Sequence, residues 1–204
     1  MCLVLLLLAC DKAVAATATR AFSVCEFFKS LLNSDHYAEL LEAEPTRQDN
    51  VESSFQKTFA DSKIYFNHFI KIHDPGVVNR KYLWMLIARG AAVLCANNQA
   101  GIDIVVPFTY SDAKLGRKNV SAILVQVKND RKLSTMLIRW LFEGMNSFFV
   151  GLFDHSDEPL PVIWMVFALS SAKSGVTILE PERTRYRRKA KQKKAKEVTT
   201  IHVL

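Results

Sequence analysis

Three polar side chains interrupt two strongly apolar stretches in the middle of the chain. Asp103 lies near the start of the stretch GIDIVVPFTY, and Gln126 and Lys128 lie near the end of VSAILVQVKND. Burial of Asp or Lys is costly unless the charged group is paired or takes part in chemistry. If the two stretches are antiparallel neighbours, a carboxylate, an amide oxygen and an ammonium group meet at one place. That combination is either a reactive or ion-binding site, or a buried ion pair between Asp103 and Lys128.

Both stretches have the composition of strands inside a covered sheet. Residues 101–110 and 120–128 are mostly β-branched or aliphatic, which predicts burial on both faces of the sheet. The polar segment 111–119 connects them. Because strand side chains alternate with a period of two, Gln126 and Lys128 must share one face, and the valines beside them the other.

The flanking sequence predicts two helices and two further strands around this pair. Asn79 is a suitable cap for the first helix. We expect helices at residues 82–98 and 133–145, and strands at 63–73 and 162–169. The expected fold class is therefore α/β, with a small mixed central sheet flanked by helices.

Length and composition are those of one domain with appendages. The chain has 204 residues, of which 50% are hydrophobic, enough for one sizeable core. We divide it into an apolar leader or truncated helix at 1–16, a helical lead-in at 17–60, an α/β core at 61–172, and a basic, largely disordered tail at 173–204.

The positive charge is concentrated in the tail. Nine of the 27 Lys and Arg residues lie in residues 183–196, so the rest of the chain has 18 basic against 20 acidic side chains. Such a polybasic segment suits nuclear targeting, sequence-independent binding to nucleic-acid phosphates, or solubility. Its basic residues are Arg183, Arg185, Arg187, Arg188, Lys189, Lys191, Lys193, Lys194 and Lys196.

The first sixteen residues, MCLVLLLLACDKAVAA, have two interpretations. An apolar run followed by small residues resembles a secretory signal, but no Lys or Arg precedes it. It is also shorter than the roughly 20 residues that span a bilayer, so no transmembrane span is expected. The alternative is a buried helix at the truncated start of a longer gene product.

The cysteines favour a reducing compartment. Cys2, Cys10, Cys25 and Cys95 lie in apolar sequence, and none forms a CxxC pair or a His spacing typical of metal sites. We therefore expect free, buried thiols and a location in the nucleus or cytoplasm. If residues 1–16 are a signal peptide, the protein is instead secreted.

The order helix, Gly-Ile-Asp103 strand, Gln126-Val-Lys128 strand, helix and strand resembles the PD-(D/E)XK restriction-endonuclease-like superfamily. The run RGAAVLCANNQAGIDIVVPFTY with AILVQVKN is similar to endonuclease-like domains of large eukaryotic proteins, including Crinkler-type effectors. The resemblance covers about residues 63–170.

The resemblance implies Mg²⁺-dependent hydrolysis of phosphodiester bonds in nucleic acid. It makes Asp103 and Gln126 the candidate metal ligands, the backbone carbonyl of Val127 a further one, and Lys128 the candidate catalytic lysine. No small-molecule cofactor is implied, and no Gly-rich phosphate loop is present.

The sequence departs from the family pattern in ways that keep other functions open. No Pro precedes Asp103, and Gln126 stands where a second carboxylate is usual. An amide offers an oxygen lone pair but no negative charge. One alternative is therefore a catalytically degenerate nuclease fold that serves as a nucleic-acid or protein interaction or effector module. A second alternative is a secreted or membrane-attached protein.

Overall fold

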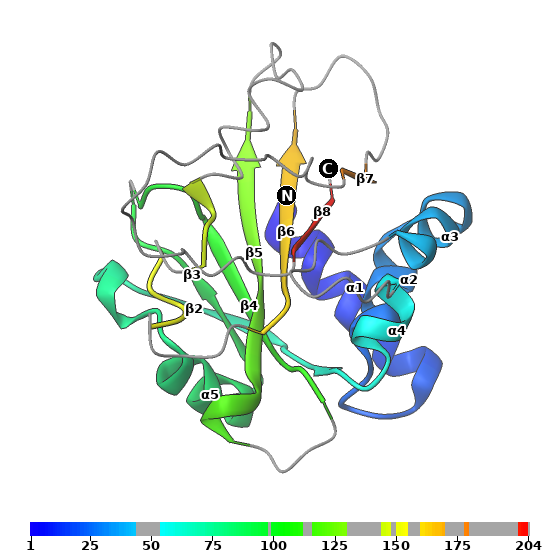
Figure 1. Cartoon of the computed structure of the whole chain (residues 1–204), viewed down its shortest axis with the longest axis horizontal. Coiled ribbons are helices and arrows are strands. Elements are labelled where there is room, and N and C mark those ends of the chain that lie inside the picture. The colour runs from blue at the N-terminus through cyan, green and yellow to red at the C-terminus, as the bar shows by residue number, and fades with distance from the viewer. Residues whose placement is uncertain are drawn as a thin grey trace, which may run out of the picture.

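The computed structural model is a mixed α/β fold in which helices cover both faces of one sheet (Figure 1). It describes residues 1–43, 54–97, 99–111, 116–129, 144–147, 150–154 and 160–169, and the backbone alone of 178–179 and 200–203. The predicted fold class is confirmed. Most of the helix expected at 133–145 lies outside the described residues, as does the basic segment 183–196.

Helices make up most of the first third of the chain. The α-helices are α1 (Cys2–Thr17), α2 (Val24–Leu31), α3 (Ser34–Glu42), α4 (Phe55–Phe59) and α5 (Arg80–Arg89), and the 3₁₀ turns are η1 (Pro75–Val77) and η2 (Arg117–Asn119).

Eight short strands form one sheet in the described part of the chain. They are β1 (Lys63–Ile64), β2 (His68–Lys71), β3 (Ala91–Leu94), β4 (Ile104–Thr109), β5 (Val120–Lys128), β6 (Val162–Ala168), β7 (Ile178–Leu179) and β8 (Thr200–Val203). Their order is β2-β3-β4-β5-β6-β8-β7, and β1 also pairs with β4. The centre, β3-β4-β5, is antiparallel, whereas β6 runs parallel to β5.

The sheet separates two hydrophobic cores. Leu6, Phe28 and Ile104 belong to the core on the side of α1–α4. Leu83 and Val105 belong to the core on the side of α5. Because neighbouring residues of β4 enter opposite cores, this strand is buried on both faces, as its composition predicts.

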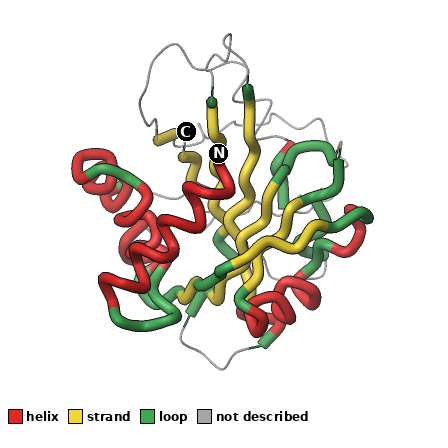
Figure 2. The backbone as a smooth tube through the Cα atoms, turned by 180° about the vertical axis from the view of Figure 1, so that it is seen from behind, coloured by secondary structure: helices red, strands yellow, loops and turns green. Residues whose placement is uncertain are grey.

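The N-terminal apolar run is a helix that fills the first core. Figure 2 shows α1 crossing the sheet, and its buried side chains include Leu6 and Cys10. This is the arrangement that the buried-helix interpretation of residues 1–16 predicts. Among the described residues, no helix is both long enough and apolar enough to cross a membrane.

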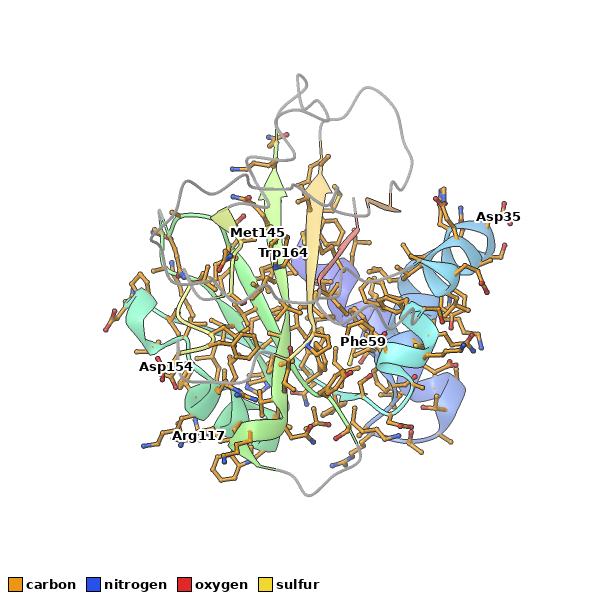
Figure 3. All side chains as sticks on the ribbon, in the orientation of Figure 1. Asp35, Phe59, Arg117, Met145, Asp154 and Trp164 are labelled. Atoms are coloured by element: carbon orange, nitrogen blue, oxygen red, sulfur yellow. The ribbon has the colours of Figure 1, made fainter. Side chains whose placement is uncertain are left out.

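Phenylalanine rings join the lead-in helices to the sheet. The ring centroids of Phe28 in α2 and Phe55 in α4 are 5.6 Å apart, and those of Phe59 in α4 and Phe108 in β4 are 5.9 Å apart, each pair edge to face. Phe59 is labelled in Figure 3, between α4 and the sheet. Edge-to-face rings stabilise beyond the area that they bury. The lead-in therefore packs directly on the strand that follows Asp103.

Two predicted elements have different bounds from those expected. Asn79 caps α5 as predicted, because its side chain accepts a hydrogen bond from the Tyr82 amide. The helix expected to reach residue 98 nevertheless ends at Arg89, where Gly90 takes a left-handed φ of 61°. The next four residues form β3 instead. A glycine in this conformation ends a helix because it has no Cβ to clash.

The strand expected at 63–73 is also divided. β1 and β2 are separated by a segment containing the fully buried Phe66, and they pair with different strands. His68 and His73 are exposed, so neither is held inside a closed ligand cluster.

Candidate metal and phosphoryl-transfer site

The antiparallel pairing of β4 and β5 places Asp103 beside the end of β5. The register ends with Ile104 opposite Val125, and Asp103 lies in a bend just before β4. Its amide donates to the Val125 carbonyl, so Asp103 lies next to the segment of β5 that contains Gln126. The antiparallel pairing on which the candidate site depends is therefore present.

Gln126 and Lys128 belong to the α5 side of the sheet. Leu124 packs into the core on that side, so strand alternation assigns these two residues to it as well, and they share one face as the sequence predicts. Asp103 lies in the bend before β4, and its carboxylate is directed at the Val127 amide of β5.

Asp103 is fixed by three hydrogen bonds at the point where β4 begins. Its amide donates to the Val125 carbonyl at 2.8 Å, and its carbonyl accepts from the Cys95 amide at 2.8 Å. Its carboxylate oxygen Oδ2 accepts from the Val127 amide at 2.7 Å. Among the described residues, the other carboxylate oxygen has no hydrogen-bond donor. The carboxylate is therefore positioned by β5 through Oδ2 alone.

The Val127 carbonyl points toward the same place. In a β-strand the amide and carbonyl of one residue face the same neighbour, because paired residues exchange both hydrogen bonds. The Val127 amide faces Asp103, so the Val127 carbonyl faces that side as well. The next carbonyl, that of Lys128, accepts from the Leu169 amide on the β6 side. The geometry agrees with the proposal of a backbone ligand at Val127.

Gln126 contributes a buried oxygen with no partner. The residue is only 7% exposed, and its Oε1 atom has no hydrogen-bond partner within the described part of the chain. A buried polar atom that lacks a partner costs stability, so such an atom in a native protein requires an explanation. A bound cation or an ordered water molecule would supply the missing interaction.

Lys128 is half-buried and does not pair with Asp103. Both residues are described, and no contact within 4.0 Å joins the ammonium to the carboxylate. The interpretation of the two as a buried ion pair is therefore wrong. The ammonium remains able to interact with an anionic group brought to this end of the sheet.

The negative charge of Asp103 contributes to the raised pKa of thiols on both sides of the sheet. Burial, with a further contribution from Asp103, raises the pKa of Cys95 to about 12. Burial also raises the pKa of Cys2 to about 12. The positive charge of the chain's amino terminus lowers this pKa, and the Asp103 charge raises it. Cys2 belongs to the α1-side core and Cys95 to the α5-side core, so the carboxylate lies at the end of the sheet, within electrostatic reach of both.

Gly101 positions this corner, a role that sequence reasoning did not assign. Its φ is +84°, and a Cβ atom on it would lie 1.9 Å from the Gly144 carbonyl oxygen. Only glycine allows the loop before Asp103 to touch the backbone at Gly144. The sequence does show a glycine two residues before Asp103, but Gly144, the residue that it contacts, is 43 positions away. The contact with Cys95 was missed because residues 91–94 were expected to be helical.

The donor atoms at this corner are all oxygens. Asp103 supplies one carboxylate, Gln126 one amide oxygen and Val127 one carbonyl, and Mg²⁺ prefers oxygen ligands. Within the described residues, no group of three or more His, Cys, Asp or Glu side chains could hold a metal. The donor types fit Mg²⁺ or Mn²⁺, with only one negative charge. Two further acidic residues, Asp112 and Asp130, follow the two strands along the chain and lie outside the described residues.

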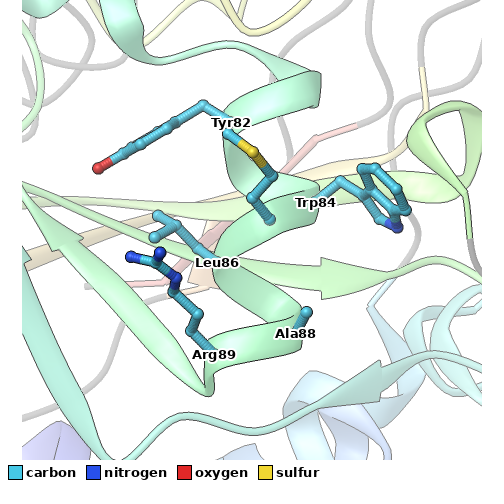
Figure 4. A pocket seen from close by; sticks show the side chains of 6 residues that line it. Tyr82, Trp84, Leu86, Ala88 and Arg89 are labelled. Atoms are coloured by element: carbon cyan, nitrogen blue, oxygen red, sulfur yellow. The ribbon is translucent and has the colours of Figure 1, made fainter.

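A separate hollow of about 530 Å³ lies along α5, away from these residues. It is lined by apolar side chains such as Tyr82 and Trp84, with Arg89 at its edge (Figure 4). None of the predicted site residues lines it.

Comparison of the chain with family models, curated proteins and solved structures finds no match.

Proposed function

We propose that this chain is a nuclease-like domain of the PD-(D/E)XK type that hydrolyses phosphodiester bonds with a divalent metal ion. The observation that carries the proposal is the 2.7 Å hydrogen bond from the Val127 amide to the Asp103 carboxylate across β4 and β5. It connects the acid to the Gln126-Val127-Lys128 segment, which occupies the place of the acid-X-Lys segment of the family pattern.

The order of elements supports the same proposal. Helix α5 precedes an antiparallel β3-β4-β5 unit, and β6 returns parallel to β5 after residues 130–161. A parallel return requires a crossover of a dozen or more residues, usually a helix. The connection between β5 and β6 is long enough for such a crossover.

In the proposed mechanism Asp103, Gln126 and the Val127 carbonyl hold the cation, and Lys128 faces the phosphate. A divalent ion held by these residues would supply polarisation of the phosphodiester and a lowered pKa for a bound water molecule. The free carboxylate oxygen of Asp103 anchors the site by charge. The Lys128 ammonium stabilises the negative charge that develops on the phosphoryl oxygens.

Cleavage of plasmid DNA and of single-stranded RNA in Mg²⁺ or Mn²⁺ tests this function. We expect cleavage by the wild-type chain that chelator abolishes, and at least a roughly 100-fold loss in Asp103→Ala and Lys128→Ala, the usual scale for removal of a catalytic group. Lys81→Ala, at an exposed position of α5, is the matched control for a lost positive charge. Cleavage that is unchanged in the two site variants contradicts the proposal.

A second candidate is a catalytically degenerate nuclease fold that binds nucleic acid or protein. The observation that favours it is the neutral Gln126 at a ligand position, which leaves the site with one carboxylate. Gln126→Glu distinguishes the two candidates. If the wild-type chain is an enzyme, it binds Mn²⁺, and Gln126→Glu raises the affinity roughly tenfold because a negative ligand is added. If the fold is degenerate, metal binding appears in Gln126→Glu alone.

The tail gives a measurable difference between these candidates. For the degenerate module we propose that residues 183–196 supply the nucleic-acid affinity and direct the protein to the nucleus. Binding should then weaken steeply with salt, need no metal, and disappear when these residues are deleted. Binding that persists after the deletion argues against this candidate.

A further inference from the structure

The hollow along α5 exposes a tryptophan. Trp84 is 38% exposed, and the neighbouring Met85 is 44% exposed. Tryptophan is highly buried on average, so an exposed indole in the wall of a hollow marks a binding surface. The volume of about 530 Å³ is that of a small-molecule pocket, and Tyr82 adds a second ring to the wall.

The two rings lie on different sides of the helix. Figure 4 shows Tyr82 and Arg89 directed to one side of α5 and Trp84 to the other. Tyr82 and Arg89 are about two helical turns apart. Helical side chains lean toward the N-terminus, so the guanidinium group of Arg89 reaches back toward the Tyr82 ring. One side of the hollow therefore combines a ring with a positive charge, and the other side offers the ring of Trp84.

All charged residues of α5 are basic. Residues 75–102 include no Asp or Glu, whereas α5 contains Arg80, Lys81 and Arg89. Of these three, Arg89 lines the hollow. It is exposed, and in the described part of the chain no acidic side chain forms an ion pair with it. A ligand with a negative charge is therefore complementary to this surface.

Charge and shape argue against two other occupants. A second copy of α5 would bring basic residues against basic residues, and like charges at an interface are costly. A helix that lies on a bilayer inserts a continuous apolar face. On α5 the exposed large apolar side chains are Trp84 and Met85, and the surface beside them is hollowed. An anionic ligand with flat rings fits both features.

We propose that this hollow binds two successive unpaired nucleotides of a single-stranded nucleic acid, with one base on Tyr82, the next on Trp84 and a phosphate at Arg89. Proteins bind single strands by stacking bases on aromatic side chains beside basic residues. Bases in a duplex are already stacked on one another, so duplex nucleic acid fits less well. The choice of nucleic acid rests on the proposed function, and Gln126 and Lys128 face the same side of the sheet as α5.

Binding of a fluorescent oligothymidylate of about ten nucleotides to the full chain tests the site, with EDTA present to prevent cleavage. Trp84→Ala should raise the dissociation constant roughly fivefold or more, the scale of one stacked base. Arg89→Ala should weaken binding and reduce the slope of log affinity against log salt by about 0.7, the contribution of one phosphate contact. Both side chains are exposed, so these variants retain the core. Lys81→Ala, exposed on α5 but outside the lining of the hollow, is the matched control and should bind like the wild type.

Photo-cross-linking locates the bound strand. An oligonucleotide that contains iodouracil should cross-link to the peptide that contains Tyr82 and Trp84. The proposal is overturned if the wild-type chain does not bind the oligonucleotide, if Trp84→Ala and Arg89→Ala bind it like the wild type, or if cross-links form only in residues 183–196. It is also overturned if Trp84→Ala weakens binding to phosphatidylserine vesicles but not to the oligonucleotide.

Failure of this inference and failure of the proposed function are separable, because binding in EDTA does not depend on cleavage. Trp84-dependent binding without metal-dependent cleavage supports the hollow and contradicts the nuclease. Metal-dependent cleavage with binding that does not depend on Trp84 does the reverse.

Discussion

At the scale of single residues, Asp103 has two functions that substitutions can separate. Its carboxylate accepts the Val127 amide and, in our proposal, also carries the only negative charge among the ligands. Asparagine retains an oxygen that can accept the hydrogen bond but loses the charge. Alanine loses both. The pair of variants therefore distinguishes a structural hydrogen bond from a metal ligand.

We expect Asp103→Ala to lower the free energy of unfolding by about 1–2 kcal/mol, because a hydrogen bond to a charged group is lost. Asp103→Asn should cost less than about 1 kcal/mol and yet abolish metal-dependent cleavage. Urea denaturation with a parallel cleavage assay measures both effects. Full cleavage by Asp103→Asn would exclude the carboxylate as a ligand.

At the scale of elements, α1 contributes a large part of the core beside the sheet. Leu6 is fully buried in the cluster that also contains Ile104, whereas Leu8 is 58% exposed on the opposite side of the helix. Removing the side chain of a buried leucine leaves a cavity and loses dispersion contacts. Removing that of an exposed leucine does neither.

Leu6→Ala should therefore destabilise the fold by about 2–5 kcal/mol. Leu8→Ala should change stability by no more than about 0.5 kcal/mol. Thermal or urea unfolding provides the comparison. Equal effects of the two substitutions would show that α1 is not packed on the sheet as described.

The elements that sequence reasoning placed correctly are those whose pattern is local. Both faces of 104–109 and 120–128 are buried, so apolar composition alone identifies these strands. Residues 91–94 were missed because Ala-Ala-Val-Leu continues the apolar spacing of α5. The decisive residue is Gly90, whose left-handed φ ends the helix, and the pairing of β3 with β2 and β4 is set by distant residues.

The candidate site divides in the same way. The identities of Asp103, Gln126 and Lys128, and the shared face of the last two, follow from composition and alternation. The Asp103–Val127 hydrogen bond and the approach of Gly101 to Gly144 depend on tertiary packing. No local pattern reports contacts between segments separated by 24 and 43 positions.

At the scale of the whole molecule, four buried thiols make stability depend on pH. All four cysteines are free and buried, as expected from the sequence. Burial raises the pKa of Cys25 to about 11 and that of Cys95 to about 12, and raises that of Cys10 as well. The folded state therefore holds these protons more tightly than the unfolded state does.

This stabilisation is complete below the unfolded thiol pKa and is lost as pH rises toward the folded values. Between pH 8 and pH 10 we expect a loss of roughly 1 kcal/mol for each strongly shifted thiol. Urea denaturation at the two pH values measures the total, and Cys95→Ala should show a smaller loss than the wild type. A loss that is identical in Cys95→Ala would mean that this thiol is not protected by burial.

In the proposed function, a carboxylate, an amide oxygen and a backbone carbonyl at one end of the sheet bind a divalent cation. Paramagnetic broadening of backbone amide signals during a Mn²⁺ titration tests it most directly. We predict that the amides of Asp103, Gln126 and Val127 broaden first, and that this selective loss disappears in Asp103→Asn. Broadening that begins elsewhere, or that is the same in Asp103→Asn, would contradict the account.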